Sequence, residues 1–273
     1  MTRTSRPRPM LALCGIVLAV LALAAAPSSG RADSDSGEAG LEIATEARER
    51  QKGFGNFTAS LTMILRNKRG RESRRELRLK VIEVADEGDR TMFVFDRPRD
   101  VKGTAFLVHS HKTTPDEQWL YLPALKRVKR ISSSKQSGSF MGSEFSYEDM
   151  GTAEVEKYTH RLLRNEPCGE FQCSVTERVP VSRDSGYSRQ LVWLDQEAFR
   201  TMQIQFFDRR DKHLKTMVVE DYKQYLDHYW RAGRITMTNH LTKKSTVLLW
   251  SDYQFGTDLD LGDFTQTALK RAR

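Results

Sequence analysis

Cysteine and histidine are scarce in this chain, with three and six residues among 273. The motifs H-E-x-x-H, C-x-x-C, the P-loop and G-x-G-x-x-G do not occur. The sequence therefore has no mark of a zinc hydrolase, a redox dithiol, a nucleotidase or a dinucleotide-binding enzyme. Seventeen glycines and eight prolines are too few for a collagen-like or low-complexity chain. The overall composition is that of a globular protein, with 38% hydrophobic and 29% charged residues.

Two short patterns come nearest to a chemical site, and neither completes one. His109 and His111 would share one face of a strand with Asp116 close by, which allows metal ligation but more often marks a solvated strand end. The stretch Gly138–Gly142 has the outline of a nucleophile elbow, but Phe140 stands where the serine is needed. We therefore expect no catalytic residues, no metal and no cofactor.

Long apolar runs are confined to the N-terminus. Three arginines and no acidic residue precede the apolar run Met10–Ala26, and small and polar residues follow it. This order is typical of a secretory signal peptide, which we place at residues 1–32, so that residues 33–273 form one mature domain beginning near Asp33. The alternative is a retained membrane anchor, because the run is close to the roughly 17 residues that a spanning helix needs.

Positive charge is modest once this leader is set aside. The chain has 44 Lys and Arg against 36 Asp and Glu, and residues 1–32 contain four arginines and no acids, which leaves 40 − 36 = +4. So small an excess disfavours nucleic acid as a partner.

Two cysteines, Cys168 and Cys173, remain in the mature chain. In an exported protein such a pair is most simply a structural disulfide. A redox pair would favour closer C-x-x-C spacing, and a metal site would need further ligands.

From residue 57 onward the hydrophobic pattern has a period of two. Apolar residues alternate with polar ones at 61–65 and 77–81, and the turn Asn67–Gly70 between them predicts a hairpin with one apolar face. Similar runs follow at 91–95, 104–109, 118–122, 158–163, 171–179, 188–194, 201–207, 214–222, 234–241 and 246–250. About a dozen strands at hairpin spacing predict a mainly β fold, an antiparallel sheet curled toward a barrel.

Two helices are expected at the ends of the mature chain. Residues 35–53 have acids ahead of bases and a narrow apolar stripe of Leu41, Ala44 and Ala47, which predicts a covering helix. Residues 259–269 predict a short final helix with Phe264 and Ala268 on one face.

Two segments depart from regular alternation. Residues 132–151 are rich in Ser and Gly but contain Phe140, Met141 and Phe145, which are too apolar to stay in water. Our hypothesis is a movable gate that packs into a cavity mouth when no cargo is present, and the alternative is a fixed aromatic plug. Residues 119–122 have large side chains on both faces, so we expect this strand to be buried on one side and covered on the other.

The stretch Gly103–Met150 resembles the outer membrane lipoprotein-sorting proteins, a LolA/LolB-like family of periplasmic carriers. The most specific matches are Gly103–Leu107, Gln118–Pro123, Arg130-Ile131 and Phe140–Ser143, with support at Tyr187–Arg189 and Tyr229-Trp230. The resemblance implies an incomplete β-barrel whose apolar concave face, closed by helices, holds acyl chains. It also implies a periplasmic, non-enzymatic carrier of lipid or acylated lipoprotein cargo, associated in many members with an inner-membrane RND/MMPL transporter. We expect the protein to be a monomer.

For such a carrier we expect a lipid-binding surface made of large apolar side chains. The alternative for residues of this kind on the strands is an ordinary structural core. The candidates are Met63, Phe93, Phe95, Phe106, Trp119, Tyr121, Phe140, Met141, Phe145, Trp193 and Phe206. Four basic residues would face a membrane or a transporter, although basic stretches are more often solvated surface: Lys126, Arg127, Lys129 and Arg130.

Two other protein classes remain open at this stage. An outer-membrane β-barrel would also be exported and alternating, but the leading helix, the high charge and the apolar loop argue against it. A periplasmic hydrolase would need a nucleophile and a base, and no such pair is evident.

Overall fold

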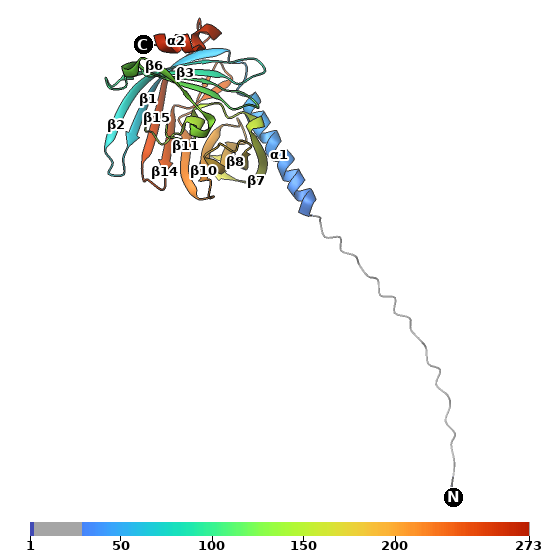
Figure 1. The fold of residues 1–273 in the computed structure, drawn as a ribbon. Coiled ribbons are helices and arrows are strands. Elements are labelled where there is room, and N and C mark those ends of the chain that lie inside the picture. Colours follow the sequence, from blue (N-terminus) through green and yellow to red (C-terminus); the bar gives the residue numbers. More distant parts are fainter. Residues whose placement is uncertain (3–28, 273) are drawn as a thin grey trace.

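The computed structural model describes residues 1–2 and 29–272, and within them the chain forms one large curled antiparallel sheet with a helix near each end (Figure 1). The expected signal peptide falls largely on residues outside the described part. The first seven strands in the chain are β1 (Asn56–Arg66), β2 (Glu72–Ile82), β3 (Arg90–Arg97), β4 (Ala105–His109), β5 (Glu117–Leu122), β6 (Arg127–Ile131) and β7 (Tyr158–Cys168). The next eight are β8 (Phe171–Pro180), β9 (Tyr187–Asp195), β10 (Thr201–Asp208), β11 (His213–Glu220), β12 (Lys223–Tyr225), β13 (Tyr229–Arg231), β14 (Arg234–Asn239) and β15 (Ser245–Phe255).

The order of the strands leaves the sheet open at one place. Thirteen strands follow one another as β6-β5-β4-β3-β2-β1-β15-β14-β11-β10-β9-β8-β7, and β12 and β13 form a separate hairpin. Strand β1 pairs with β15, so the beginning and the end of the strand series meet in the middle of the sheet. The two edges, β6 and β7, are consecutive in the chain and do not pair with each other. The predicted incomplete barrel is therefore confirmed.

Alternation along the strands explains which face is buried. In β1 every second residue from Phe57 to Met63 is buried, and the predicted turn at Asn67–Gly70 joins β1 to β2. Asn67 stabilises that turn because its side-chain Oδ1 accepts bonds from the backbone N–H groups of Arg69 and Arg71. The inward residues of β1–β6, β9–β11 and β13–β15 form one continuous apolar core.

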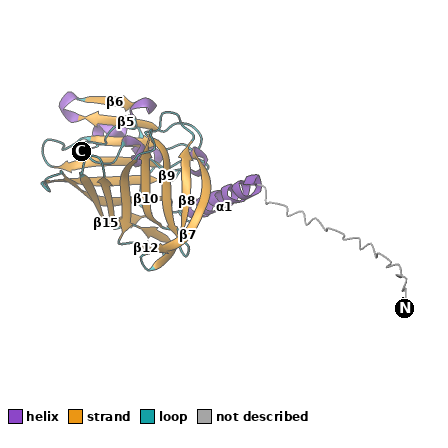
Figure 2. Cartoon of the chain, turned by 90° about the horizontal axis from the view of Figure 1, so that it is seen from below, coloured by secondary structure: helices purple, strands orange, loops and turns teal. Residues whose placement is uncertain are grey.

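Helix α1 (Ser29–Glu49) lies along the edge strand β7 (Figures 1 and 2). It begins earlier than predicted and ends before Gly53, which has the positive φ of 86° that glycine tolerates. Gly40 makes the close approach possible, since a Cβ there would lie 2.6 Å from the backbone of Arg161. Of the predicted stripe, Ala47 packs on the core together with Ile43, whereas Leu41 is 48% exposed.

The C-terminal segment covers the outer face of β3–β5. It consists of a 3₁₀ turn, Leu261–Phe264, and helix α2 (Gln266–Arg271), and it buries Phe264 and Leu269 completely. A second apolar cluster lies beneath it and contains Met92, Leu107 and Trp119. Both faces of β5 are therefore covered, as its sequence predicted.

The connection from β6 to β7, residues 132–157, crosses the inside of the curled sheet, and we call it the plug loop. Phe140 is fully buried and contacts three rings of the sheet, those of Phe93, Phe95 and Phe106, at centroid distances of 5.0–6.1 Å. The segment predicted to leave water does so, and it packs against the inner side of β2–β5.

Among the described residues, no helix is both long enough and apolar enough to span a membrane.

Candidate functional site

The main cavity lies over the other half of the sheet, mainly on the inner side of β8–β15. It has a volume of about 670 Å³, and a second cavity of about 370 Å³ adjoins it. Seven residues line both cavities and mark their junction: Ala47, Gln51, Thr152, Ala153, Arg178, Thr201 and Arg231. The space is therefore bounded by the end of α1, the plug loop and the inner faces of β8–β15, and the smaller cavity also reaches Phe57, Val81 and Thr91 of β1–β3.

The floor of the main cavity is apolar because of the pairing register. Ile204 of β10 lies opposite Val192 of β9 and Met217 of β11, and on β14 Ile235 pairs with Val219. All five residues project from the same face, and all except Val192, which lines the adjoining cavity, line the main one. A continuous strip of side chains that cannot hydrogen-bond thus faces the open space, and it would gain free energy by covering apolar ligand surface.

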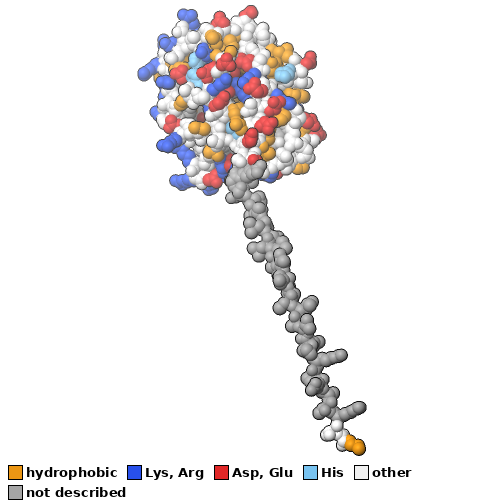
Figure 3. Space-filling view, turned by 90° about the vertical axis from the view of Figure 1, so that its right-hand side faces the viewer, with side chains coloured by type: hydrophobic (Ala, Val, Ile, Leu, Met, Phe, Trp, Pro, Cys, Tyr) orange, Lys and Arg blue, Asp and Glu red, His pale blue; other side chains and the backbone are white. Residues whose placement is uncertain are grey.

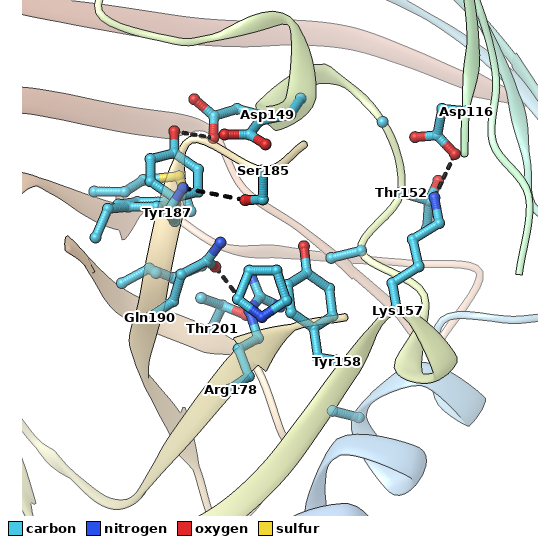
Figure 4. A pocket seen from close by; sticks show the side chains of 18 of the residues that line it. Asp116, Asp149, Thr152, Lys157, Tyr158, Arg178, Ser185, Tyr187, Gln190 and Thr201 are labelled. Carbon is cyan, nitrogen blue, oxygen red and sulfur yellow. Dashed lines mark hydrogen bonds and ion pairs between the residues drawn. The ribbon is translucent and has the colours of Figure 1, made fainter. Parts of the chain in front are cut away.

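The walls of the cavity are polar and carry several cations (Figure 4). Arg178 of β8 donates from Nε to Gln190 Oε1 at 2.8 Å and lies over the ring of Tyr158, with Cζ 4.6 Å from its centroid. Across the opening, Lys157 forms an ion pair with Asp116. Arg200 pairs with the fully buried Asp195 at 2.8 Å.

A buried polar network joins the plug loop to the sheet beside this cavity. Lys215 of β11 pairs with Asp149 at 2.6 Å and also donates to the backbone oxygen of Glu144. Tyr187 donates to Asp149 Oδ1 at 2.8 Å, and burial together with the neighbouring carboxylates raises its pKa well above the usual value. These bonds fix the loop segment that forms the cavity wall.

Glu148 is the carboxylic acid of the cavity lining whose pKa is moved into the neutral range. Burial, followed by repulsion from Asp149, raises the pKa of its carboxyl to about 7. Its two oxygens accept from the backbone N–H of Gly186 at 3.1 and 3.2 Å, which partly opposes the rise. The carboxyl is thus poised to titrate near neutral pH.

Most of the residues expected to bind lipid come together, but in the core rather than in the open cavity. Seven of them are buried in the main core: Met63, Phe93, Phe95, Phe106, Phe140, Phe145 and Phe206. Met141 packs against the same core and is partly exposed. Only Phe206 among the expected residues also lines the open cavity.

Three expected lining residues require correction, because they lie on the outer face. Trp119 and Tyr121 belong to the cluster beneath α2. Trp193 packs with Cys173 and Val175 and donates its indole N–H to Glu166 at 2.7 Å. The physical reason is that outer helices and the hairpin disulfide create apolar environments on the convex side, so a large aromatic side chain does not identify the inner face.

The remaining expected groups lie away from the cavity. Cys168 and Cys173 form the disulfide that the sequence predicted, across the β7–β8 turn. His109 Nε2 lies 2.7 Å from the backbone oxygen of Phe264, and burial lowers the pKa of the ring. No group of three or more His, Cys, Asp or Glu side chains within the described residues is arranged to hold a metal ion.

The four basic residues, Lys126, Arg127, Lys129 and Arg130, are exposed on or beside the edge strand β6. Arg130 forms a surface ion pair with Glu117 at 3.2 Å. Charged side chains on an edge strand also hinder pairing with another sheet, which is a sufficient structural role. Figure 3 shows a face of the molecule on which acidic, basic and hydrophobic side chains are intermixed, in keeping with the small net charge.

Sequence reasoning missed the arginines of the cavity, Arg178, Arg200 and Arg231. In a strand with alternating burial, a polar residue that faces a cavity follows the same pattern as one that faces solvent. The one signal in the sequence was the expected curl of the sheet, which places some polar side chains on its concave face. Without the register, that signal does not select particular residues.

Comparison with known proteins places this geometry in a family. An outer membrane lipoprotein-sorting protein domain from Vibrio parahaemolyticus is 51% identical, with 86% of this chain and 100% of that chain covered and a TM-score of 0.85. A DUF1329 family protein from Desulfovibrio piger is 26% identical over 86% of this chain and 99% of that one, with a TM-score of 0.81. A LolA superfamily protein from Nitrosomonas europaea shares the fold at 22% identity and a TM-score of 0.68, over 84% and 98% of the two chains.

No curated protein sequence matches the chain. A family model with the description "Uncharacterized protein" matches residues 87–271, which include the plug loop and the cavity strands. Half of the aligned residues are identical to those of the Vibrio domain over that domain's full length, so the chain belongs to the family of outer membrane lipoprotein-sorting proteins and has a LolA-like fold.

Proposed function

We propose that this protein is a periplasmic carrier that shields the acyl chains of a lipid or an acylated lipoprotein on their way toward the outer membrane. The observation that carries the proposal is the open cavity of about 670 Å³ with an apolar floor, on an incomplete barrel. That volume lies within the range of about 300–1,000 Å³ typical of small-molecule sites. The resemblance to lipoprotein-sorting proteins supports the same function.

The energetics suit reversible carriage. Each methylene group that leaves water contributes about 0.8 kcal/mol, so a long acyl chain gains several kcal/mol before ordering costs. Hydrophobic burial is non-directional, so the floor around Ile204 and Met217 accepts chains of different length.

In this proposal export removes residues 1–32, the chain acts as a monomer without a cofactor, and it binds cargo rather than converting it. Lys126, Arg127, Lys129 and Arg130 would meet an anionic membrane or an inner-membrane RND/MMPL transporter. Intact-mass analysis of the exported protein tests whether the leader is cleaved. The mass of a chain that begins near Asp33 would support cleavage, and a leader retained in the membrane fraction would contradict it.

The cargo experiment is mass spectrometry of the lipids that co-purify with the mature protein, followed by displacement of a fluorescent fatty-acid probe. Met217→Trp would fill the cavity and should abolish probe binding. Val218→Trp is the matched control, because successive residues of a strand point to opposite faces. Both variants must show a cooperative thermal transition. If the purified protein carries no lipid and binds no probe, the proposed carrier function is wrong.

A further inference from the structure

Two arginines at the junction of the cavities differ from the other cations there. Lys157, Arg200 and Arg48 each pair with a carboxylate, respectively of Asp116, Asp195 and Glu154. Arg178 and Arg231 line both cavities, yet within residues 29–272 neither forms an ion pair with a carboxylate.

Their protein partners are neutral. Arg178 uses Nε for Gln190 and stacks on Tyr158. Arg231 donates from Nη1 to Gln51 Oε1 at 2.5 Å and to the backbone oxygen of Trp230 at 3.1 Å. It also lies 5.3–5.7 Å from the centroids of four aromatic rings: Phe54, Phe57, Tyr229 and Phe255.

These surroundings hold the guanidinium groups in place without an ion pair, although Asp89 and Glu83 favour the charge of Arg231 from a greater distance. A guanidinium has five N–H donors and stays charged in proteins, so most donors of Arg178 are not used by its bond to Gln190. Burial lowers the pKa of Arg231, which shows that its environment disfavours charge. A partly buried cation of this kind is stabilised strongly by an anion that reaches it.

The apolar floor begins beside Arg178, and Arg231 lines the same junction of the two cavities. Strand register places Arg178 opposite Gln190, Gln190 opposite Phe206, and Val192 opposite Ile204 on the next row of the same face. A ligand with an anionic end at the arginines would therefore lay its apolar part over β9–β11. An acid of any size could pair with the arginines. Only an amphiphile could pair with the arginines and also cover the apolar floor.

We infer that the cavity selects an anionic amphiphile, whose carboxylate or phosphate is bound by Arg178 and Arg231 and whose acyl chain covers Ile204, Phe206 and Met217. The inference rests on the proposed carrier function and narrows its cargo to acyl compounds with a negative end. A neutral acyl compound would make the contacts with the apolar floor, but it would offer no anion to the two guanidinium groups.

The experiment is titration calorimetry of the mature protein at neutral pH with dodecanoate, 1-dodecanol, acetate and inorganic phosphate. We expect dodecanoate to bind at least tenfold more tightly than dodecanol, a difference of about 1.4 kcal/mol. Acetate and phosphate should bind more weakly than dodecanoate, because they lack the chain. This comparison needs no variant and so does not depend on how a substitution folds.

Variants then test the two residues. Arg178→Gln and Arg231→Gln should each weaken dodecanoate binding about tenfold and leave dodecanol binding unchanged. Arg210→Gln, which removes an exposed arginine of the β10–β11 turn, is the matched control and should change neither.

The outcomes separate the two proposals. Equal affinity for dodecanoate and dodecanol in all variants would overturn the anion site and leave the carrier standing. Binding of acetate or phosphate as tight as that of dodecanoate would identify a site for free anions and would overturn the amphiphile. Absence of binding by both twelve-carbon compounds would overturn the anion site and the carrier together.

Discussion

Lys215 of β11 and Asp149 of the plug loop form a buried ion pair, with Nζ 2.6 Å from Oδ2 and side chains that are 4% and 7% exposed. The pair connects the sheet to the loop beside the main cavity. Asp149 also accepts from the Tyr187 hydroxyl and the Ser146 backbone N–H, and Lys215 also donates to the backbone oxygen of Glu144. The position of the cavity wall therefore depends on this contact.

Lys215→Met should be strongly destabilising. It leaves the Asp149 carboxylate buried without its cation, and breaking a buried pair in this way typically costs about 3–5 kcal/mol. Equilibrium denaturation in urea measures the loss. Lys212→Met, at an exposed position nearby, is the control and should stay within about 0.5 kcal/mol of the parent protein. Equal stability of the two variants would show that the pair does not hold the loop.

A second variant separates the charge from the contact. Asp149→Leu in the Lys215→Met background removes the remaining charge, so the double variant should be less destabilised than the sum of the two single ones. Additive losses would contradict a coupled pair.

Glu148 should make stability depend on pH. Its folded-state pKa of about 7 lies above its ordinary value of 4.5, so the folded state holds the proton more tightly than the unfolded state. This contribution is fully present below about pH 4.5 and is lost as pH rises toward and through 7. Glu148→Gln should therefore be more stable relative to the parent at pH 8 than at pH 5.

Melting temperatures measured from pH 5 to pH 8 check this. The control is Glu170→Gln, at the exposed β7–β8 turn, whose difference from the parent should be flat across the same range. A flat difference for Glu148→Gln as well would mean that the Glu148 carboxyl titrates as it does in water.

Trp119→Ala should lower stability without weakening ligand binding. The side chain packs beneath α2 on the outer face, and removal of a buried tryptophan costs about 3–5 kcal/mol. Phe206→Ala removes a ring that lines the cavity and should weaken dodecanoate binding as well as folding. Calorimetry well below both melting temperatures distinguishes them. A larger loss of affinity in Trp119→Ala than in Phe206→Ala would indicate that the ligand binds on the outer face, and it would contradict binding in the cavity.

The same residues show how far the sequence could predict this protein. Alternation at 61–65 and 77–81 was enough to predict the hairpin, because a strand with one buried face must alternate. The faces of β3–β5 were not predictable, since α2 buries the outer side as well, and Phe93 and Met92 are both core residues. Which face a strand turns inward depends on register across thirteen strands, a long-range property.

The cavity was harder to predict than the sheet. The apolar content of the plug loop correctly indicated that it packs inside, but not that it lies against β2–β5 or that the main cavity lies mainly over β8–β15. Arg178 and Arg231 are 53 positions apart in the chain, and only the curl of the sheet brings them to one junction. The pattern of residues along a single strand contains no information about which distant side chains line the same cavity.

Hydrogen exchange should divide the plug loop into two parts. Phe140 and Phe145 are 0% and 4% exposed in the main core, and neither lines the cavity, so protection at residues 139–145 should be high and unchanged when dodecanoate binds. Residues 148–153 include the cavity wall, and ligand contact should raise their protection. Phe140→Leu, which retains an apolar side chain, should increase exchange at 139–145 equally with and without ligand. A fall in protection at 139–145 on binding would instead show that this segment moves aside as a gate, because cargo and the loop would then compete for the same surface.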